Sequence, residues 1–101
     1  MTHEDSRRIL TSMPYKDGEI KIIVAKERCE LGNHYHKIKT ENFTLIAGSG
    51  IVELEGEKSL IYEGDTIEVN PNEKHAFFLD KDSILFCICS HPYDHSDDYT
   101  Y

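Results

Sequence analysis

Three histidines and one glutamate form the most distinctive pattern in this sequence of 101 residues. His34 and His36 are separated by one residue, Glu41 follows shortly after, and His75 lies much later in the chain. A β-strand alternates its faces and rises about 3.3 Å per residue, so the first two histidines would project from the same side, about 6.6 Å apart. Two imidazoles at this spacing can converge on one ion.

Three imidazoles and a carboxylate suit a first-row divalent metal. Zinc, iron, manganese and nickel accept such ligands, whereas calcium prefers a shell of oxygens. Taken alone, each histidine is more often a surface residue or a hydrogen-bonded core residue, so the prediction depends on the four residues occurring together. The sequence predicts one divalent transition-metal ion of open identity, with the ligands His34, His36, Glu41 and His75.

The neighbouring residues extend this pattern into two blocks. The first block contains Gly32, His34, His36, Glu41 and Gly48, and the second contains Gly64, Pro71 and His75. Together they resemble the two signature motifs of the cupin family, and the resemblance covers about residues 20–90. It implies an all-β fold, a small double-stranded β-helix or jelly-roll barrel, in which both motifs meet at one site. Asn72 and Glu73 depart from the glycine common in the second motif, which affects turn geometry and leaves the ligand positions intact.

Short alternating segments separated by turn residues indicate many strands. The expected strands are residues 20–25, 33–38, 43–47, 51–55, 58–62, 66–69, 75–79 and 84–89. Eight short strands at this spacing are typical of a sandwich or barrel. The chain is expected to form one domain, residues 1–101. An N-terminal arm, about residues 1–15, carries a short helical turn at residues 7–10, and whether the acidic, aromatic tail at about 91–101 folds back over the barrel mouth stays open.

The interval between His36 and Glu41 is odd, so a straight strand would place these two side chains on opposite faces. A turn near residues 39–40 must therefore carry Glu41 onto the next strand. The same alternation then directs Phe43 and Leu45 toward the interior.

In the later motif, His75 shares its strand face with Phe77 and Leu79, while Phe78 points the other way. Phe78 is a candidate for packing against a second subunit, and the cupin resemblance implies a homodimer. The interior side chains predict a dry pocket beside the metal, although the same residues would also suit the core of a small barrel. The expected lining residues are Phe43, Leu45, Phe77 and Leu79.

Three cysteines give no disulfide framework. Cys87 and Cys89 would share one strand face in an apolar run. Such residues are more often small core side chains than soft metal ligands, and their role stays open at this stage.

The formal net charge of -8 and the absence of a basic cluster argue against nucleic-acid binding. No apolar run approaches the roughly 18 residues of a membrane helix, and the first residues lack the apolar region of a signal peptide. We therefore expect a cytoplasmic protein whose partner is a small molecule, with no nucleic acid and no membrane.

Two segments narrow the expected function. Residues 32–37 and the Tyr-Asp…Asp-Tyr pattern in residues 90–101 are similar to cupin domains of nucleotide-sugar and capsular-polysaccharide biosynthesis. This resemblance implies an isomerase or epimerase that acts on a sugar or nucleotide sugar beside the metal. The alternatives are an iron-dependent dioxygenase and a small-molecule or metal-binding module without catalysis. The sequence does not assign catalytic residues.

Overall fold

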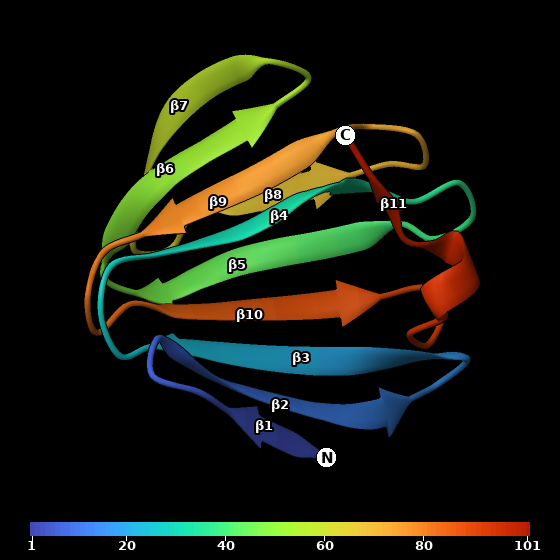
Figure 1. The fold of residues 1–101 in the computed structure, drawn as a ribbon, viewed down its shortest axis with the longest axis horizontal. Coiled ribbons are helices and arrows are strands. Elements are labelled where there is room, and N and C mark those ends of the chain that lie inside the picture. The colour runs from blue at the N-terminus through green and yellow to red at the C-terminus, as the bar shows by residue number, and fades with distance from the viewer.

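The computed structural model describes residues 1–101, and nearly all of its regular structure is β (Figure 1). The strands are β1 (Thr2–Glu4), β2 (Arg8–Tyr15), β3 (Gly18–Ala25), β4 (Cys29–Tyr35), β5 (Glu41–Ala47), β6 (Ser49–Leu54), β7 (Glu57–Tyr62), β8 (Thr66–Val69), β9 (His75–Leu79), β10 (Ile84–Cys89) and β11 (Tyr99–Thr100). The helical element is a short 3-10 turn, η1 (His95–Asp97). The all-β class predicted from the sequence is confirmed. No helix in the chain has the length and apolar character needed to cross a membrane.

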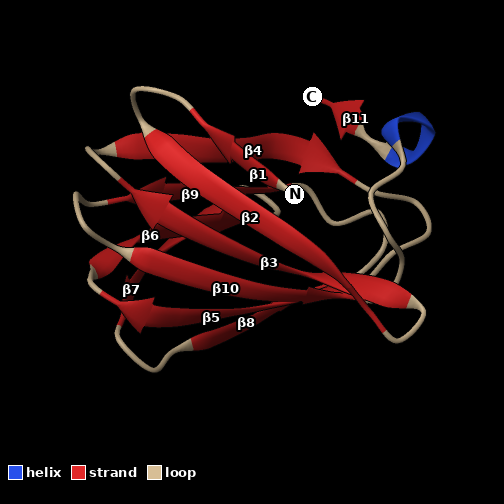
Figure 2. Cartoon of the chain, turned by 90° about the horizontal axis from the view of Figure 1, so that it is seen from below, coloured by secondary structure: helices blue, strands red, loops and turns tan.

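Two antiparallel sheets face each other and enclose the interior (Figure 2). One sheet has the strand order β1-β2-β3-β10-β5-β8, and the other has the order β11-β4-β9-β6-β7. Strands that are distant in sequence lie side by side in both sheets, as when β10 inserts between β3 and β5. This arrangement is the jelly-roll barrel that the resemblance to the cupin motifs implies, and it places β4 beside β9.

The N-terminal arm differs from expectation because it is extended. The helical turn predicted at residues 7–10 is wrong: β2 pairs with β3 from Arg8↔Ala25 to Tyr15↔Gly18. Strand β1 covers the outer edge of β2 only as far as Thr11. Pro14 lies beyond this point, where the edge of β2 is open, so its missing N–H breaks no hydrogen bond between strands.

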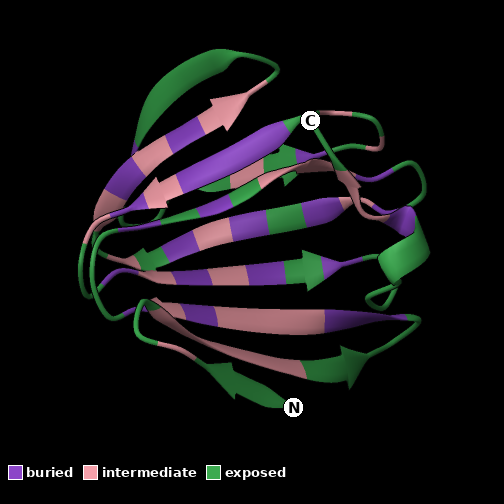
Figure 3. Cartoon of the chain, in the orientation of Figure 1, coloured by how far each residue is buried: buried purple, intermediate pink, exposed green.

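Apolar side chains from both sheets form one core. Strands of both sheets carry buried residues (Figure 3). Phe43 and Leu45 are 6% and 0% exposed, which confirms the inward direction derived from the odd interval before Glu41. Phe77 packs on Phe43 with ring centroids 4.6 Å apart. Phe78, on the opposite face, is half-buried beneath the Lys58 ammonium, and its part in a homodimer stays a prediction.

Gly32 creates the irregularity that turns β4 toward the interior cluster. The pairing of β4 with β9 shifts register between Gly32 and His34, and Gly32 has a φ of +104°. A Cβ at this position would lie 2.8 Å from the carbonyl oxygen of His75, so close backbone packing and a positive φ both require glycine. The shift places His34 directly across from His75.

Candidate metal centre

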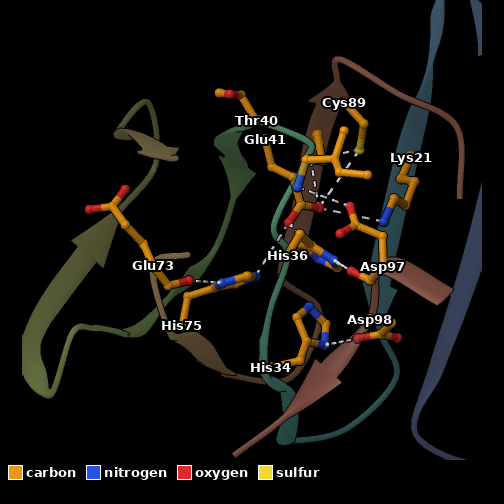
Figure 4. A network of polar contacts seen from close by, with 12 residues as sticks. Lys21, His34, His36, Thr40, Glu41, Glu73, His75, Cys89, Asp97 and Asp98 are labelled. Carbon is orange, nitrogen blue, oxygen red and sulfur yellow. Dashed lines mark hydrogen bonds and ion pairs between the residues drawn. The ribbon is translucent and has the colours of Figure 1, made fainter. Parts of the chain in front are cut away.

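The fold brings the four predicted ligand side chains together (Figure 4). Their ligand atoms all lie within 4.8 Å of one another. The two nearest in sequence come from the end of β4 and the residue just beyond it, while the other two open β5 and β9. We call this group the histidine–glutamate cluster; it consists of His34, His36, Glu41 and His75.

One oxygen of Glu41 is the focus of the cluster. The Nε2 atoms of His36 and His75 lie 3.2 Å and 3.3 Å from Glu41 Oε1. The ring centroid of His34 is 4.7 Å from each of the other two imidazole centroids. Three of the four side chains are almost fully buried, whereas His34 is half-buried and forms the solvent-facing side of the cluster.

Hydrogen bonds outside the cluster fix the tautomers of two imidazoles. The Nδ1–H of His36 donates to the carbonyl oxygen of Asp97 at 2.7 Å, and that of His75 donates to the carbonyl of Glu73 at 3.1 Å. A carbonyl oxygen can only accept, so each Nδ1 carries a proton and each neutral ring presents the lone pair of Nε2 to the cluster. Asp98 Oδ1 lies 3.5 Å from Nδ1 of His34.

The inner atoms of the cluster have no hydrogen-bond partner. His36 Nε2, His75 Nε2 and Glu41 Oε1 are all buried and unpartnered. Two nitrogen lone pairs facing a carboxylate oxygen repel one another, and burial without a partner is costly for each polar atom. A cation among them would satisfy all three, and this nitrogen-rich donor set fits a first-row transition metal.

The surroundings favour the protonation states that a metal needs. Burial opposes the charged form of Glu41, but its pKa is held well below the usual range by hydrogen bonds from His36 and His75, whose inner nitrogens donate when the rings are protonated, and by the charge of Lys21. Burial, followed by the proximity of His75, lowers the pKa of His34 to about 4. A carboxylate and a neutral imidazole are both competent ligands.

The second oxygen of Glu41 faces a different environment. Lys21 Nζ lies 3.6 Å from Glu41 Oε2, and the thiols of Cys89 and Cys87 lie 3.7 Å and 3.8 Å from it. The two sulfur atoms are 3.6 Å apart. Both cysteines belong to the apolar core, in agreement with the interpretation that they are small core side chains.

The C-terminal tail folds back onto the cluster, which the sequence left open. Strand β11 pairs with β4, opposing Tyr99 to Tyr35 and Thr100 to His34. The buried carboxylate of Asp97 accepts the backbone N–H groups of Lys37 and Ile38 at 2.9 Å and 3.3 Å. This tail therefore holds the loop after β4 and supplies the carbonyl that orients His36.

A cavity of about 580 Å³ opens beside the cluster. Phe43 and Phe77 line it as expected, whereas Leu45 and Leu79 lie in the packed core and do not contribute to this lining. The lining also includes polar side chains from β2 and β3, namely Arg8, Ser12, Glu19 and Lys21.

Sequence reasoning missed the polar residues of β3. Glu19 and Lys21 alternate with outward residues and share their strand face with Ile23, which is buried. Two charged residues on the inward face of a strand could have indicated that polar groups line an interior site. Lys21 Nζ lies 4.0 Å from Glu19 Oε1, so the two form a charged pair at the cavity wall.

Comparison with known proteins identifies the family. The family model described as "Cupin domain" matches residues 20–91, and the chain therefore belongs to the cupin family. No curated protein matches the sequence.

Several solved structures are similar in fold. The capsular polysaccharide assembling protein CapF from Staphylococcus aureus superimposes with a TM-score of 0.84 at 19% identity, covering 99% of this chain and 31% of that chain. KdgF from Halomonas sp. gives a TM-score of 0.82 at 17% identity, covering 95% of this chain and 90% of that chain. A variant of Streptomyces PAC13 with uridine gives 0.74 at 14% identity, covering 100% and 87%.

The likeness to these structures concerns the fold. This chain spans about a third of the length of the CapF chain that it matches. Function must therefore be argued from the residues of the site.

Proposed function

We propose that this cupin binds one divalent transition metal, zinc, iron, manganese or nickel, through the histidine–glutamate cluster. The observation that carries the proposal is the set of buried, unpartnered ligand atoms on His36, His75 and Glu41, which face one another across a few ångströms. When bound, the ion would supply Lewis-acid polarisation of a ligand carbonyl.

We further propose that the protein is an isomerase or epimerase of a small sugar-derived molecule. The adjoining cavity, with aromatic walls and several polar side chains, supports binding of a small hydroxylated ligand. Sugar chemistry is consistent with the resemblance of the two sequence segments to capsular-polysaccharide cupins, and the structural likeness to a capsular polysaccharide assembling protein adds to it.

Glu19 is our candidate for the proton acceptor of this reaction. It lines the cavity, is 9% exposed, and its buried Oε1 has no hydrogen-bond partner. A carboxylate in this position could take a proton from the carbon beside a carbonyl and return it to the former carbonyl carbon, while the proton of the adjacent hydroxyl passes to the carbonyl oxygen. Lys21, beside both Glu19 and Glu41, would keep the two carboxylates from repelling each other.

The test is hydrogen exchange in deuterated water. Metal-loaded protein is incubated without oxygen with a panel of keto sugars and nucleotide sugars, and deuterium incorporation is followed by NMR. We expect incorporation next to the carbonyl, its loss in Glu19→Gln with metal content retained, and no effect of Glu27→Gln, which removes an exposed carboxylate.

Two other outcomes would contradict the isomerase proposal. Oxygen-dependent turnover of the iron-loaded protein would assign it to the dioxygenases. Ligand binding without exchange across the panel would assign it to binding modules without catalysis.

A further inference from the structure

The cavity contains a cationic side chain that forms no salt bridge. Arg8 lines the cavity wall, and its Nε atom is buried without a hydrogen-bond partner. The other two arginines are paired, Arg7 with Asp5 at 3.7 Å and Arg28 with Asp80 at 3.8 Å. In a chain with a formal net charge of -8, an unpaired guanidinium facing an interior cavity requires explanation.

No carboxylate forms a salt bridge with Arg8, and Asp98, which also lines the cavity, lies 3.5 Å from His34. The closest connection is to Asp5, whose Oδ1 accepts the backbone N–H of Arg8, while its other oxygen faces Arg7. Lys21, the other side chain of the cavity wall that ends in a cationic group, already has two carboxylate neighbours in Glu19 and Glu41. Among the lysine and arginine side chains of this wall, Arg8 is therefore the one without a carboxylate partner, and it is available to an incoming anion.

The position of Arg8 defines the shape of such a ligand. Alternation along β2 places Arg8, Leu10 and Ser12 on the cavity face, and Ser12 pairs with Lys21, the residue that contacts Glu41. The backbone of Arg8 is four residues from Ser12, a strand distance of about 13 Å. The long arginine side chain can reduce the distance that a ligand must span between the guanidinium and the histidine–glutamate cluster. One elongated small molecule could contact the histidine–glutamate cluster and Arg8 together.

We propose that the natural ligand is an anionic sugar or sugar-derived acid whose oxyanion, a carboxylate or a phosphate, is bound by the Arg8 guanidinium. The planar fork of arginine matches both groups, and the unpartnered Nε–H supplies one of its two donors. The ligand's other end would carry hydroxyl or carbonyl oxygens toward the cluster. This inference rests on the proposed function only for the contact between the ligand oxygens and the histidine–glutamate cluster.

The test compares three sugars with the same ring. Galacturonate, galactose 6-phosphate and galactose differ at one carbon, which carries a carboxylate, a phosphate or a neutral hydroxyl. Binding to the zinc-loaded full chain is measured by calorimetry at constant ionic strength, with acetate and inorganic phosphate as simple anions that need only the arginine. We expect the anions to bind more tightly than galactose, and the stronger of the two sugar anions identifies the oxyanion.

Variants assign the effect to Arg8. Arg8→Gln should weaken binding of the preferred anion about tenfold or more, while Arg8→Lys, which keeps the charge and loses the fork, should fall between. Arg7→Gln is the matched control, because it removes the same charge from the adjacent, exposed residue and should leave affinity within about twofold. If Arg8→Gln does not fold, Arg8→Lys supplies the comparison.

Three results would overturn the inference: equal affinity for galactose and its anionic forms, no binding of any anionic probe, or unchanged affinity in the folded Arg8 variants. A His36→Ala protein separates this inference from the proposed function. Suppose that the His36→Ala protein and the wild type both lack metal, and that both still bind the anions in a way that Arg8→Gln weakens. The metal proposal then fails and the anion inference stands.

Discussion

The two oxygens of Glu41 face two clusters that look equally able to hold a cation. Oε1 faces His36 and His75, and Oε2 faces Cys87 and Cys89, with sulfur atoms 3.6 Å apart. Within each of the two clusters, the donor atoms lie within 4.8 Å of one another. Proximity of donors alone therefore does not distinguish a metal site from a packed core.

The difference lies in what surrounds each set of donors. On the nitrogen side, acceptors outside the cluster fix the rings so that lone pairs face inward, and the cavity reaches three of the ligand residues. On the sulfur side, the thiols are close enough to hydrogen-bond one another and Glu41, and the ammonium of Lys21 already compensates the carboxylate. A cation is needed on the first side and disfavoured on the second.

The largest expected effect comes from removing a nitrogen ligand. His36→Ala should reduce metal content from about one ion per chain to near zero after dialysis, because one ligand of the shared site is lost. Elemental analysis measures this, and His91→Ala, which removes an exposed histidine, is the control. Full metal content in His36→Ala would place the ion elsewhere.

A smaller effect is expected from the tail that orients His36. Asp97→Ala keeps the carbonyl that accepts from His36 but removes the carboxylate that binds Lys37 and Ile38. Metal affinity should fall about 10–100-fold, measured by competition with a chelator. Asp17→Ala removes the same charge at an exposed turn and should change nothing. Equal affinities in the two variants would show that the tail does not support the site.

The smallest effect on the metal is expected on the sulfur side. Cys89→Ala should leave one ion per chain with unchanged affinity, while the free energy of unfolding falls by about 1 kcal/mol through loss of a buried side chain. Chelator competition and denaturant unfolding measure the two quantities. A tenfold loss of metal affinity would mean that sulfur participates in binding.

Local patterns were enough to predict much of this site. Strand alternation and the odd interval after His36 predicted that Glu41 opens a new strand with Phe43 and Leu45 inward, as the structure has it. The N-terminal strand β2 was missed because its pairing with β3 outweighs its weak local pattern and Pro14. Tertiary pairing of this kind leaves little signal in a single segment.

The hydrogen bond that orients His36 from outside the cluster could not be predicted from the sequence. Asp97 contacts a residue 61 positions away, and only the folded tail reveals that its backbone carbonyl, rather than its side chain, accepts from His36. Every residue type has such a carbonyl, so residue identity gives no signal for it. By contrast, Lys21 and Glu19 could have been predicted to face inward from their alternation with Ile23.

X-ray absorption spectroscopy of the zinc-loaded protein tests most directly whether the ion binds on the nitrogen side of Glu41. The account predicts a shell of nitrogen and oxygen neighbours at about 2.0–2.2 Å with imidazole scattering and no sulfur. A sulfur neighbour at about 2.3 Å would contradict it.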